Sequence, residues 1–402
     1  MDKKFVMGIA AMAALTLVSC SSDDLDSLSG DSSKNEAISF DGYLGRSAVA
    51  VNGTRGSVEN KETLKTKGFG VFGNYIADAG QTSDANFFKN QPVTCPGTKW
   101  TYSPLKYWPT NGHIDFLAYA PYNKDQKLKE NTTTHENTTT FDFTVVPEAA
   151  KQIDLLWANA TGQIKTDFEG TTKEKVKFLF KHALSRLGYT VKLSGNYSPN
   201  NATFTLKKIT LAGSPDETKE AFYKTGTIDL SKTDTKENLS MTNKTTGLWT
   251  AATDNNKQNF TWFEGSYKVE SSDPKHPTKL DPTTSQNKDY SDKDYLFVIP
   301  QDFSQTKTEG HDVDELYVIV EYDVAYKSES GTPTTTITNK VYKKLSIDLM
   351  QGKAYMLNLT IGLPIEFDID VENVVGVEDW TNDTDNKITD LPIDSWDDIS
   401  RK

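Results

Sequence analysis

The sequence contains little cysteine, little arginine and few long apolar runs. Only two of its 402 residues are cysteine, and the first of them, Cys20, closes an apolar run at the N-terminus. If Cys20 is modified there, as argued below, Cys95 has no partner and the mature protein contains no internal disulfide. No later segment offers 18 consecutive apolar residues, so nothing after the N-terminal run is expected to span a membrane as a helix.

Motifs for catalysis and nucleotide binding are missing as well. The chain has no G-x-S-x-G, H-E-x-x-H, G-x-x-x-x-G-K-[ST] or C-x-x-C sequence. The acidic stretches 311–315 and 383–390 lack the glycine that an EF-hand loop needs at its sixth position. A formal net charge of -12 disfavours nucleic acid as a partner. We therefore expect no enzymatic activity, no cofactor, no metal site and no nucleic-acid binding.

Arginine is scarce in a chain that is rich in lysine. Among the 44 basic residues, Arg46 and Arg55 are two of very few arginines, and both lie in the stretch 42–57 of glycine, serine and other small residues. Segments of this composition are where proteolytic nicking concentrates. An Arg-specific protease would therefore find one accessible interior window. Taken alone, the scarcity of arginine is more simply explained by lysine-rich codon usage, with the clustering of Arg46 and Arg55 due to chance.

The N-terminus has the parts of a secretory signal. Lys3 and Lys4 form a positive start, residues 5–18 are largely apolar, and small residues precede Cys20. The sequence Leu-Val-Ser-Cys resembles the lipobox of bacterial lipoproteins, in which the cysteine becomes the first mature residue and carries acyl chains. Several acyl chains anchor a protein stably where a single one does not. The sequence thus predicts a signal peptide over 1–19 and attachment to outer-membrane lipid through Cys20.

From residue 37 onward the dominant pattern is that of β-strands. Short alternating or aromatic-rich runs are bounded by glycine, proline, asparagine and aspartate. A long series of such runs predicts an all-β fold of two antiparallel β-sandwich domains in tandem. The one candidate helical turn, residues 182–187, fits a strand equally well. The predicted organisation is a flexible tether over 20–36, an N-terminal sandwich over 37–170, a C-terminal sandwich over 171–380 and an acidic tail over 381–402.

Several stretches of the sequence together resemble one known family. They are the lipobox, AISFDGYL (37–44), Thr54-Arg55-Gly56 with GFGVFGNY (68–75), WTYSPLKYWPTNGHIDFLAYAPY (100–122), IDLLWANA (153–160), FKHALSRLGYTVKL (180–193) and YMLNLTIGL to VEDW (355–380). The family that they resemble is the fimbrillins, the lipoprotein pilins of Gram-negative anaerobes. The resemblance implies transthyretin-like sandwiches, export as a lipoprotein, cleavage after an arginine near the N-terminus and assembly into a surface fimbria. Acidic residues after the lipid-bearing cysteine are associated in that family with export to the outer face of the outer membrane, with a plain spacer as the alternative.

The assembly step that the resemblance implies is replacement of the first strand. Cleavage, better matched at Arg55 than at Arg46, would free residues 37–45 and leave an open sheet edge to which another chain can add a strand. In the family the donor comes from the C-terminal end of a neighbouring subunit. The candidates here are the last strand (354–363) and the acidic tail. The apolar residues concerned are Ile38, Phe40, Tyr43 and Leu44 in the removable strand, and Ile388, Leu391, Ile393, Trp396 and Ile399 in the tail.

The predicted function is that of a structural or accessory fimbrial subunit that supports adhesion. Its expected locations are the outer-membrane surface before processing and the fimbria afterwards. Its expected partners are other fimbrial subunits, an Arg-specific protease and a host protein or glycan. The alternative is a monomeric surface lipoprotein that binds glycans on an aromatic platform of Trp100, Tyr107 and Trp108. A hydrolase whose paired carboxylates cannot be read from the sequence is a third and weaker interpretation.

Overall fold

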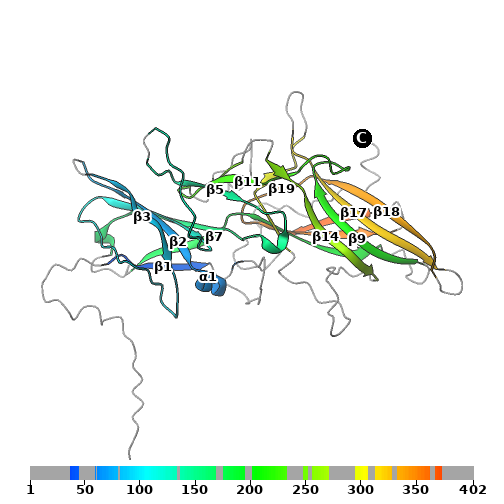
Figure 1. Ribbon diagram of the computed structural model, residues 1–402, viewed down its shortest axis with the longest axis horizontal. Coiled ribbons are helices and arrows are strands. Elements are labelled where there is room, and N and C mark those ends of the chain that lie inside the picture. Colours follow the sequence, from blue (N-terminus) through cyan, green and yellow to red (C-terminus); the bar gives the residue numbers. More distant parts are fainter. Residues whose placement is uncertain are drawn as a thin grey trace, which may run out of the picture.

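Strands account for nearly all regular structure in the described part of the chain. The computed structural model describes residues 37–44, 59, 61–79, 82–133, 136–168, 175–194, 202–232, 248–251, 256–270, 295–306, 313–327, 333–362 and 367–373. The molecule is elongated, with one group of strands at each end and shorter strands between them (Figure 1). The prediction of an all-β chain is confirmed.

The first group of strands forms one six-stranded sheet. Its neighbours are antiparallel except at one edge, where β1 runs parallel to β7. This parallel pair was not predicted, because its partners lie far apart in the sequence. The strand order is β1 (Phe40–Leu44), β7 (Val176–His182), β6 (Leu156–Gln163), β4 (His113–Ala120), β2 (Phe69–Ile76) and β3 (Asp84–Val93).

This sheet curls so strongly that its two edge strands meet across the core. β1 and β3 stand at opposite ends of the strand order, yet the rings of Phe40 and Phe88 lie 5.4 Å apart in an edge-to-face contact. The segment that follows β3 completes the closure, since the amide of Ile38 donates to the carbonyl of Lys106 at 2.8 Å. One continuous sheet therefore encloses a layered core.

The second group consists of two four-stranded sheets that share one apolar core. Tyr189 and Trp262, which come from different sheets, have ring centroids 4.6 Å apart. β20 runs parallel to β8, a second departure from purely antiparallel pairing. One sheet has the order β14 (Phe260–Val269), β9 (Ala202–Ala212), β17 (Leu316–Lys327), β18 (Pro333–Leu345), and the other β15 (Leu296–Val298), β8 (Ser185–Leu193), β20 (Ala354–Ile361), β21 (Phe367–Asn373).

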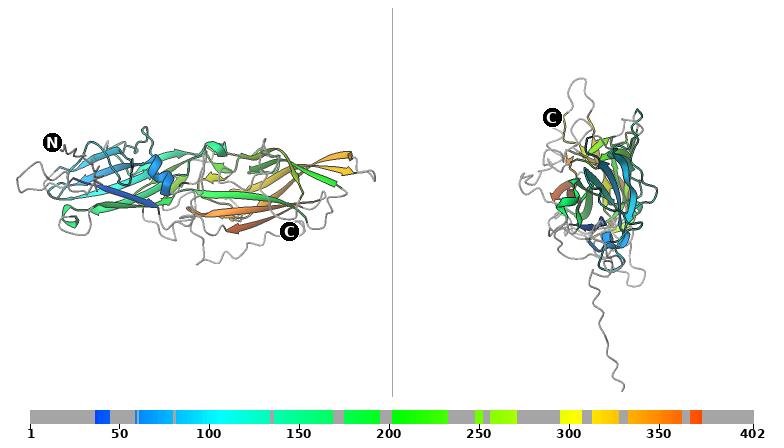
Figure 2. Two further views of the ribbon diagram at one scale, coloured as in Figure 1. Left: turned by 90° about the horizontal axis from the view of Figure 1, so that it is seen from below. Right: turned by 90° about the vertical axis from the view of Figure 1, so that its left-hand side faces the viewer.

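Short strands connect the two groups. β5 belongs to the N-terminal half by sequence but pairs with β11 of the C-terminal half. Figure 2 shows the resulting continuous, narrow body from two further sides. The short sheets are β5 (Thr140–Thr144) with β11 (Thr225–Asp229) and β12 (Trp249–Ala251), β10 (Phe222–Tyr223) with β13 (Lys257–Gln258), and β16 (Gln301–Asp302) with β19 (Asp348–Leu349).

The domain boundary expected near residue 170 does not separate the sheets. β7 lies beyond that point and still belongs to the first sheet, and the second group begins with β8 at Ser185. The candidate helical turn at 182–187 is instead the end of β7 and the start of β8. A polar stretch at 168–175 suggested a linker, but the alternation that follows it continues the first sheet, and pairing with β6 decides where β7 belongs.

One short helix was not predicted. α1 (Lys61–Lys67) buries Leu64 in the same apolar cluster as β1 and ends at Gly68, which has φ +68°. The other helical turns are η1 (Ala149–Lys151) and η2 (Lys165–Asp167). Within the described residues, none of the helices has the length and apolar character needed to cross a membrane.

Candidate functional site at the first strand

The first-strand site consists of β1, its neighbour β7, the segment 100–107 on its other side and the side chains beneath it. Ile38, just before β1, and Phe40 and Leu44 within it are 0%, 1% and 4% exposed. Burial of this kind contributes about 1.5–3 kcal/mol for each large apolar side chain. Phe40 lies among the rings of Tyr102, Phe88, Phe116 and Phe178, at centroid distances of 5.2, 5.4, 5.4 and 5.7 Å.

Tyr43, expected among the apolar residues that fill this site, lies on the outer face and is 39% exposed. Side chains alternate between the two faces of a strand, so the inward position between Phe40 and Leu44 belongs to Gly42. A Cβ atom at Gly42 would come within 2.7 Å of Cε1 of Phe69 and 3.2 Å of Cε2 of Phe180. The site therefore holds three large apolar side chains and one position that accepts only a very small residue.

Both edges of β1 are hydrogen bonded. On one side β1 forms a parallel ladder with β7, in which Phe40 is opposite Val176 and Leu44 is opposite Phe180. On the other side, the indole nitrogen of Trp100 donates to the carbonyl of Gly42 at 3.0 Å, and the hydroxyl of Tyr102 donates to the carbonyl of Ile38 at 2.7 Å. These bonds reach only main-chain atoms of β1, so they do not depend on which side chains the strand carries.

The outer face of the ladder carries two register pairs. Asp41 is the register partner of Lys177, and Tyr43 is the register partner of Leu179, which is 46% exposed. The outer face of β1 therefore presents an acidic and an aromatic residue in register with a basic and an aliphatic residue of β7.

A buried polar cluster lies next along the chain. Asp154 accepts a hydrogen bond from the backbone amide of Glu59 at 2.7 Å with one oxygen and contacts Nδ1 of His182 at 2.9 Å with the other. Glu59 is also paired with Lys67 of α1. Burial is the largest influence on the Glu59 carboxyl and raises its pKa, although Lys67 opposes this. The cluster holds residue 59, four positions after Arg55, against the end of β7.

The aromatic residues proposed as a glycan platform are not gathered on the surface. Trp108 is buried, with its ring stacked on Phe168 at 4.7 Å, and Trp100 is engaged by Gly42 and Phe69. Of the three platform residues, only Tyr107 is exposed, at 50%. These side chains hold β1 and its core in place instead of offering a binding face.

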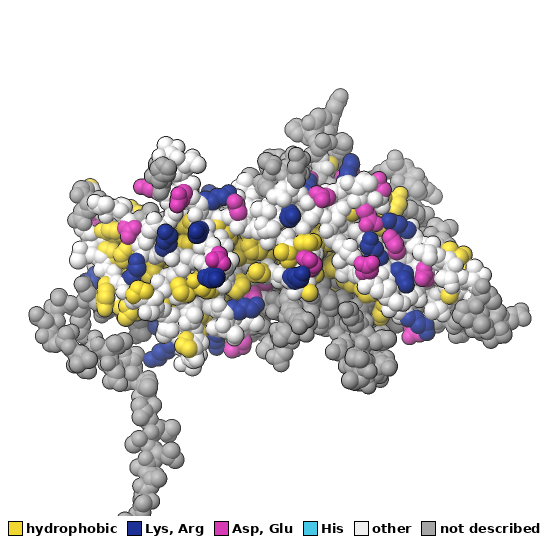
Figure 3. Space-filling view, in the orientation of Figure 1, with side chains coloured by type: hydrophobic (Ala, Val, Ile, Leu, Met, Phe, Trp, Pro, Cys, Tyr) yellow, Lys and Arg dark blue, Asp and Glu magenta, His cyan; other side chains and the backbone are white. Residues whose placement is uncertain are grey.

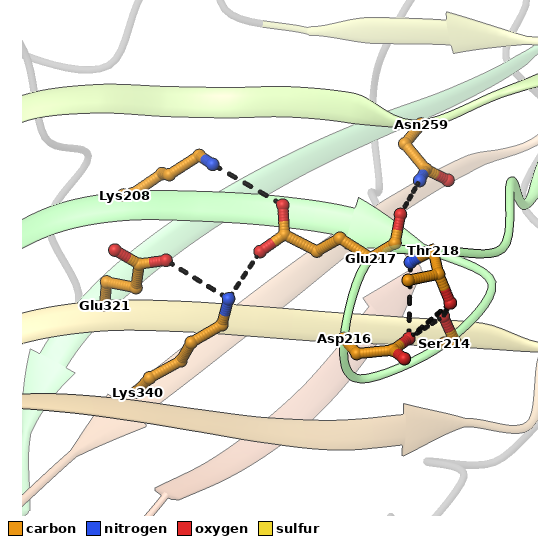
Figure 4. A network of polar contacts seen from close by, with 8 residues as sticks. All are labelled: Lys208, Ser214, Asp216, Glu217, Thr218, Asn259, Glu321 and Lys340. Carbon is orange, nitrogen blue, oxygen red and sulfur yellow. Dashed lines mark hydrogen bonds and ion pairs between the residues drawn. The ribbon is translucent and has the colours of Figure 1, made fainter.

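A second polar network lies on the outer face of the sheet that contains β9, β17 and β18 (Figure 4). Lys340 bridges Glu217 and Glu321 at 2.7 and 3.4 Å, and Lys208 reaches Glu217 at 3.5 Å. In the adjoining turn, Asp216 accepts from Ser214 and Thr218, and these hydrogen bonds lower the pKa of Asp216 to about 2. The network attaches this turn to the sheet. On the face shown in Figure 3, basic and acidic side chains are interspersed, as expected for a solvated surface.

The C-terminal candidates for a donor strand differ in position. β20, which covers most of the predicted last strand, is hydrogen bonded to β8 on one side and β21 on the other. β21 is an edge strand that buries Ile369 and Val371. The tail residues Ile388, Leu391, Ile393, Trp396 and Ile399 lie outside the described residues, as do Cys20, Arg46 and Arg55.

Arg186 and the acidic stretch 311–315 have structural roles where they are described. Arg186 is fully buried, with its guanidinium 4.1 Å from the ring centroid of Tyr295. Asp314, from the acidic stretch 311–315, pairs with Lys257 and accepts from Gln301. Among the described residues there is no group of three histidine, cysteine, aspartate or glutamate side chains arranged to hold a metal ion.

Trp100, Tyr102, Gly42 and the Glu59–Asp154–His182 cluster were not assigned to the site from sequence. Gly42 carried a readable signal, since it stands at an inward position of an alternating run. The other contacts join residues 28 to 95 positions apart, and no local pattern announces them.

The protein is thus an all-β protein whose first strand lies at a sheet edge and is held there by both side chains and main-chain hydrogen bonds. Comparison with known proteins identifies its family. The chain belongs to the fimbrillin-like family, whose model matches residues 54–380.

The chain is also similar to individual proteins, in sequence or in structure. The chain is 28% identical over 408 residues to fimbrium subunit Fim1C of Phocaeicola vulgatus, covering 94% of this chain and 97% of that protein. A crystal structure of a fimbrial protein from Bacteroides vulgatus superimposes with a TM-score of 0.53 at 21% identity, over 84% of this chain and 98% of the other. A putative cell adhesion protein from Bacteroides uniformis aligns over 87% of this chain and all of its own, with 15% identity and a TM-score of 0.41.

Proposed function

We propose that this chain is a subunit of a cell-surface fimbria that assembles by exchange of its first strand and supports adhesion. It is exported as a lipoprotein anchored through Cys20 at the outer membrane. An Arg-specific protease then cuts after Arg55, β1 leaves, and a strand from a neighbouring subunit takes its place. Membership of the fimbrillin-like family and similarity to a fimbrium subunit support the fimbrial part of the proposal.

The observation that carries the exchange step is the position of β1. It is an edge strand, and its ladder partner β7 is followed by four further strands that pair among themselves without it. Removing β1 would expose a sheet edge and the apolar positions of Ile38, Phe40 and Leu44, which is a template for strand addition. An incoming strand that filled these three positions would gain roughly 4.5–9 kcal/mol before the cost of ordering it.

The anchored segment after Arg55 supports this choice of cleavage site over Arg46. Asp154 fixes the backbone of Glu59, so a cut after Arg55 would leave only three residues before a held position. A cut after Arg46 would leave twelve residues, 47–58, before that held position.

The acidic tail is the better donor of the two candidates. Withdrawing β20 would remove a central strand that is hydrogen bonded on both sides, whereas the tail follows the last edge strand, β21. Pro392 is compatible with a strand at a sheet edge.

The test uses the mature chain from Ser21 onward, treated with a limiting amount of Arg-specific protease. We expect a single cut after Arg55 by intact mass, followed by a ladder of oligomers in size-exclusion chromatography. Arg55→Lys should abolish the cut and the ladder, whereas the matched variant Arg46→Lys should abolish neither. A clean cut that leaves a stable monomer would contradict the exchange mechanism.

A further inference from the structure

The removable strand and the C-terminal tail are similar over six residues. Residues 38–43 read ISFDGY and residues 391–396 read LPIDSW. The two stretches share an aliphatic residue, an apolar residue, an aspartate, a small residue and an aromatic residue in the same order and spacing. The corresponding pairs are Ile38 with Leu391, Phe40 with Ile393, Asp41 with Asp394, Gly42 with Ser395 and Tyr43 with Trp396.

We propose that the tail of a second copy occupies the first-strand site in this register, parallel to β7, with Ser395 in the place of Gly42. The inference rests on the proposed strand exchange and specifies which residues meet. Residues 391–396 would then take the positions of residues 38–43, which they resemble in sequence.

The position of Gly42 fixes the register. A Cβ atom there would lie 2.7 Å from Phe69, which is itself fully buried and packed against Trp100 at a ring-centroid distance of 4.8 Å. Ser395 has the smallest side chain between residues 388 and 399. With Ser395 at this position, Leu391 and Ile393 fall on the two inward positions before it. A slip by one residue would turn Asp394 or Trp396 inward.

The outer face fits the same register. Asp394 would lie opposite Lys177, where Asp41 lies now, and Trp396 would lie opposite Leu179, where Tyr43 lies now. An acidic and an aromatic residue would thus stand in register with a basic and an aliphatic one, as in the present strand. The match therefore extends to both faces, although only the inner face was used to set the register.

In this register, the proline of the tail would keep the main-chain hydrogen bond that the carbonyl of Ser39 accepts. Pro392 would take the place of Ser39, whose carbonyl accepts a hydrogen bond from the amide of Val176 at 2.9 Å, and proline retains its carbonyl. One position earlier, it would replace Ile38, whose amide donates to Lys106. That slip would lose a hydrogen bond which proline cannot make.

The similarity ends at Trp396. Asp397 would fall at the position of Leu44, which is 4% exposed, and Ser395 brings a Cβ atom that Gly42 lacks. The tail should therefore fill the site less well than β1 does. Two substitutions in the tail, Ser395→Gly and Asp397→Leu, should improve the fit, whereas Ser395→Val should spoil it.

The experiment separates the register from the exchange mechanism. In the chain from Ser21 onward, residues 47–53 are replaced by the recognition sequence of a site-specific protease, so that release of β1 does not depend on Arg55. The N-terminal fragment carries a fluorophore on its α-amino group, and its displacement from the cut protein is followed by anisotropy. The competitors are synthetic peptides of residues 37–44, residues 388–400, the three tail variants and a scrambled tail of the same composition.

We expect the 37–44 peptide and the tail peptide to displace the fragment and the scrambled peptide to fail. Ser395→Val should weaken the tail by about tenfold or more, the effect expected for overpacking a filled site. Ser395→Gly and Asp397→Leu should each strengthen it.

Displacement by the 37–44 peptide with no displacement by the tail, or a tail unaffected by Ser395→Val, would overturn the register and leave strand exchange standing. Failure of the 37–44 peptide itself to exchange would overturn strand exchange and this inference with it.

Discussion

Trp100 donates a hydrogen bond from its indole nitrogen to the carbonyl oxygen of Gly42, 58 positions earlier in the chain, at 3.0 Å. The same indole packs on Phe69, the ring that leaves no room for a side chain at Gly42. One residue therefore holds the first strand by its main chain and also helps to define which residue that strand can carry.

Gly42→Ala should destabilise the protein by about 1–3 kcal/mol, because the added Cβ overpacks against Phe69 and Phe180. Urea unfolding monitored by tryptophan fluorescence measures the change. Gly97→Ala is the matched control, since a Cβ atom there meets nothing within 4 Å. Equal effects of the two substitutions would mean that Gly42 is not a packing constraint.

Phe40→Ala should cost about 3–5 kcal/mol, the range for removal of a buried phenylalanine. Tyr43→Ala, on the outer face of the same strand, should cost far less, within about 0.5 kcal/mol of the wild type. Chemical denaturation of both variants compares the two faces. A loss at Tyr43 as large as that at Phe40 would contradict the orientation of β1.

Tyr102→Phe removes the hydroxyl that donates to the carbonyl of Ile38 and should cost about 0.5–1.5 kcal/mol. The readout is hydrogen exchange of the β1 amides, which should become faster while exchange in β9 and β17 stays unchanged. Tyr107→Phe, at an exposed position in the same segment, is the control and should leave β1 protection as it is.

Asp154→Ala should destabilise the protein by at least about 1–3 kcal/mol, because the buried amide of Glu59 and the ring of His182 both lose a partner. It should also accelerate cleavage after Arg55 by loosening the chain that follows. Timed proteolysis with mass analysis measures this, with exposed Asp125→Ala as the control. Unchanged cleavage would show that the cluster does not hold this segment.

Glu217 should contribute to stability at neutral pH and lose that contribution in acid. Burial raises the pKa of its carboxyl, but contacts with Lys340 and Lys208 outweigh this and hold the pKa below its ordinary value of 4.5. The contribution is therefore complete above pH 4.5 and disappears as pH falls through the lower folded value. The stability gap between wild type and Glu217→Gln should stay constant above about pH 4.5 and narrow as the pH falls further in urea titrations. A gap independent of pH would rule out this ion pairing.

Features that depend on residues close together in the sequence could be predicted, and features that depend on residues far apart could not. Alternation made β1, β4 and β17 readable, because a two-residue period is local. The parallel pairings of β1 with β7 and of β20 with β8 were missed, since each joins strands separated by more than a hundred residues. The boundary was misplaced because β7 pairs with β6 across the polar stretch 168–175, which suggested a linker.

At the site, the sequence identified the strand, but the prediction of which side chains point into the core was wrong for Tyr43. Tyr43 was expected with the apolar residues, yet the strict alternation from Phe40 to Leu44 turns it outward and gives the inward position to Gly42. Trp100 and Trp108 belonged to the alternative interpretation of a glycan platform, and the structure places Trp108 in the core and Trp100 against Phe69.

The parallel pairing of β1 with β7 also determines when during folding β1 can join its sheet. Phe40 is opposite Val176, so a further 136 residues must be synthesised after Phe40 before the first strand can meet its partner. Closing so long a loop carries an entropic cost that local hairpins avoid, and non-local pairing is slow. The N-terminal strand, first to leave the ribosome, therefore docks late, onto a sheet whose other strands can pair without it. In the strand exchange proposed above, this late-docking edge strand would also be the strand that leaves.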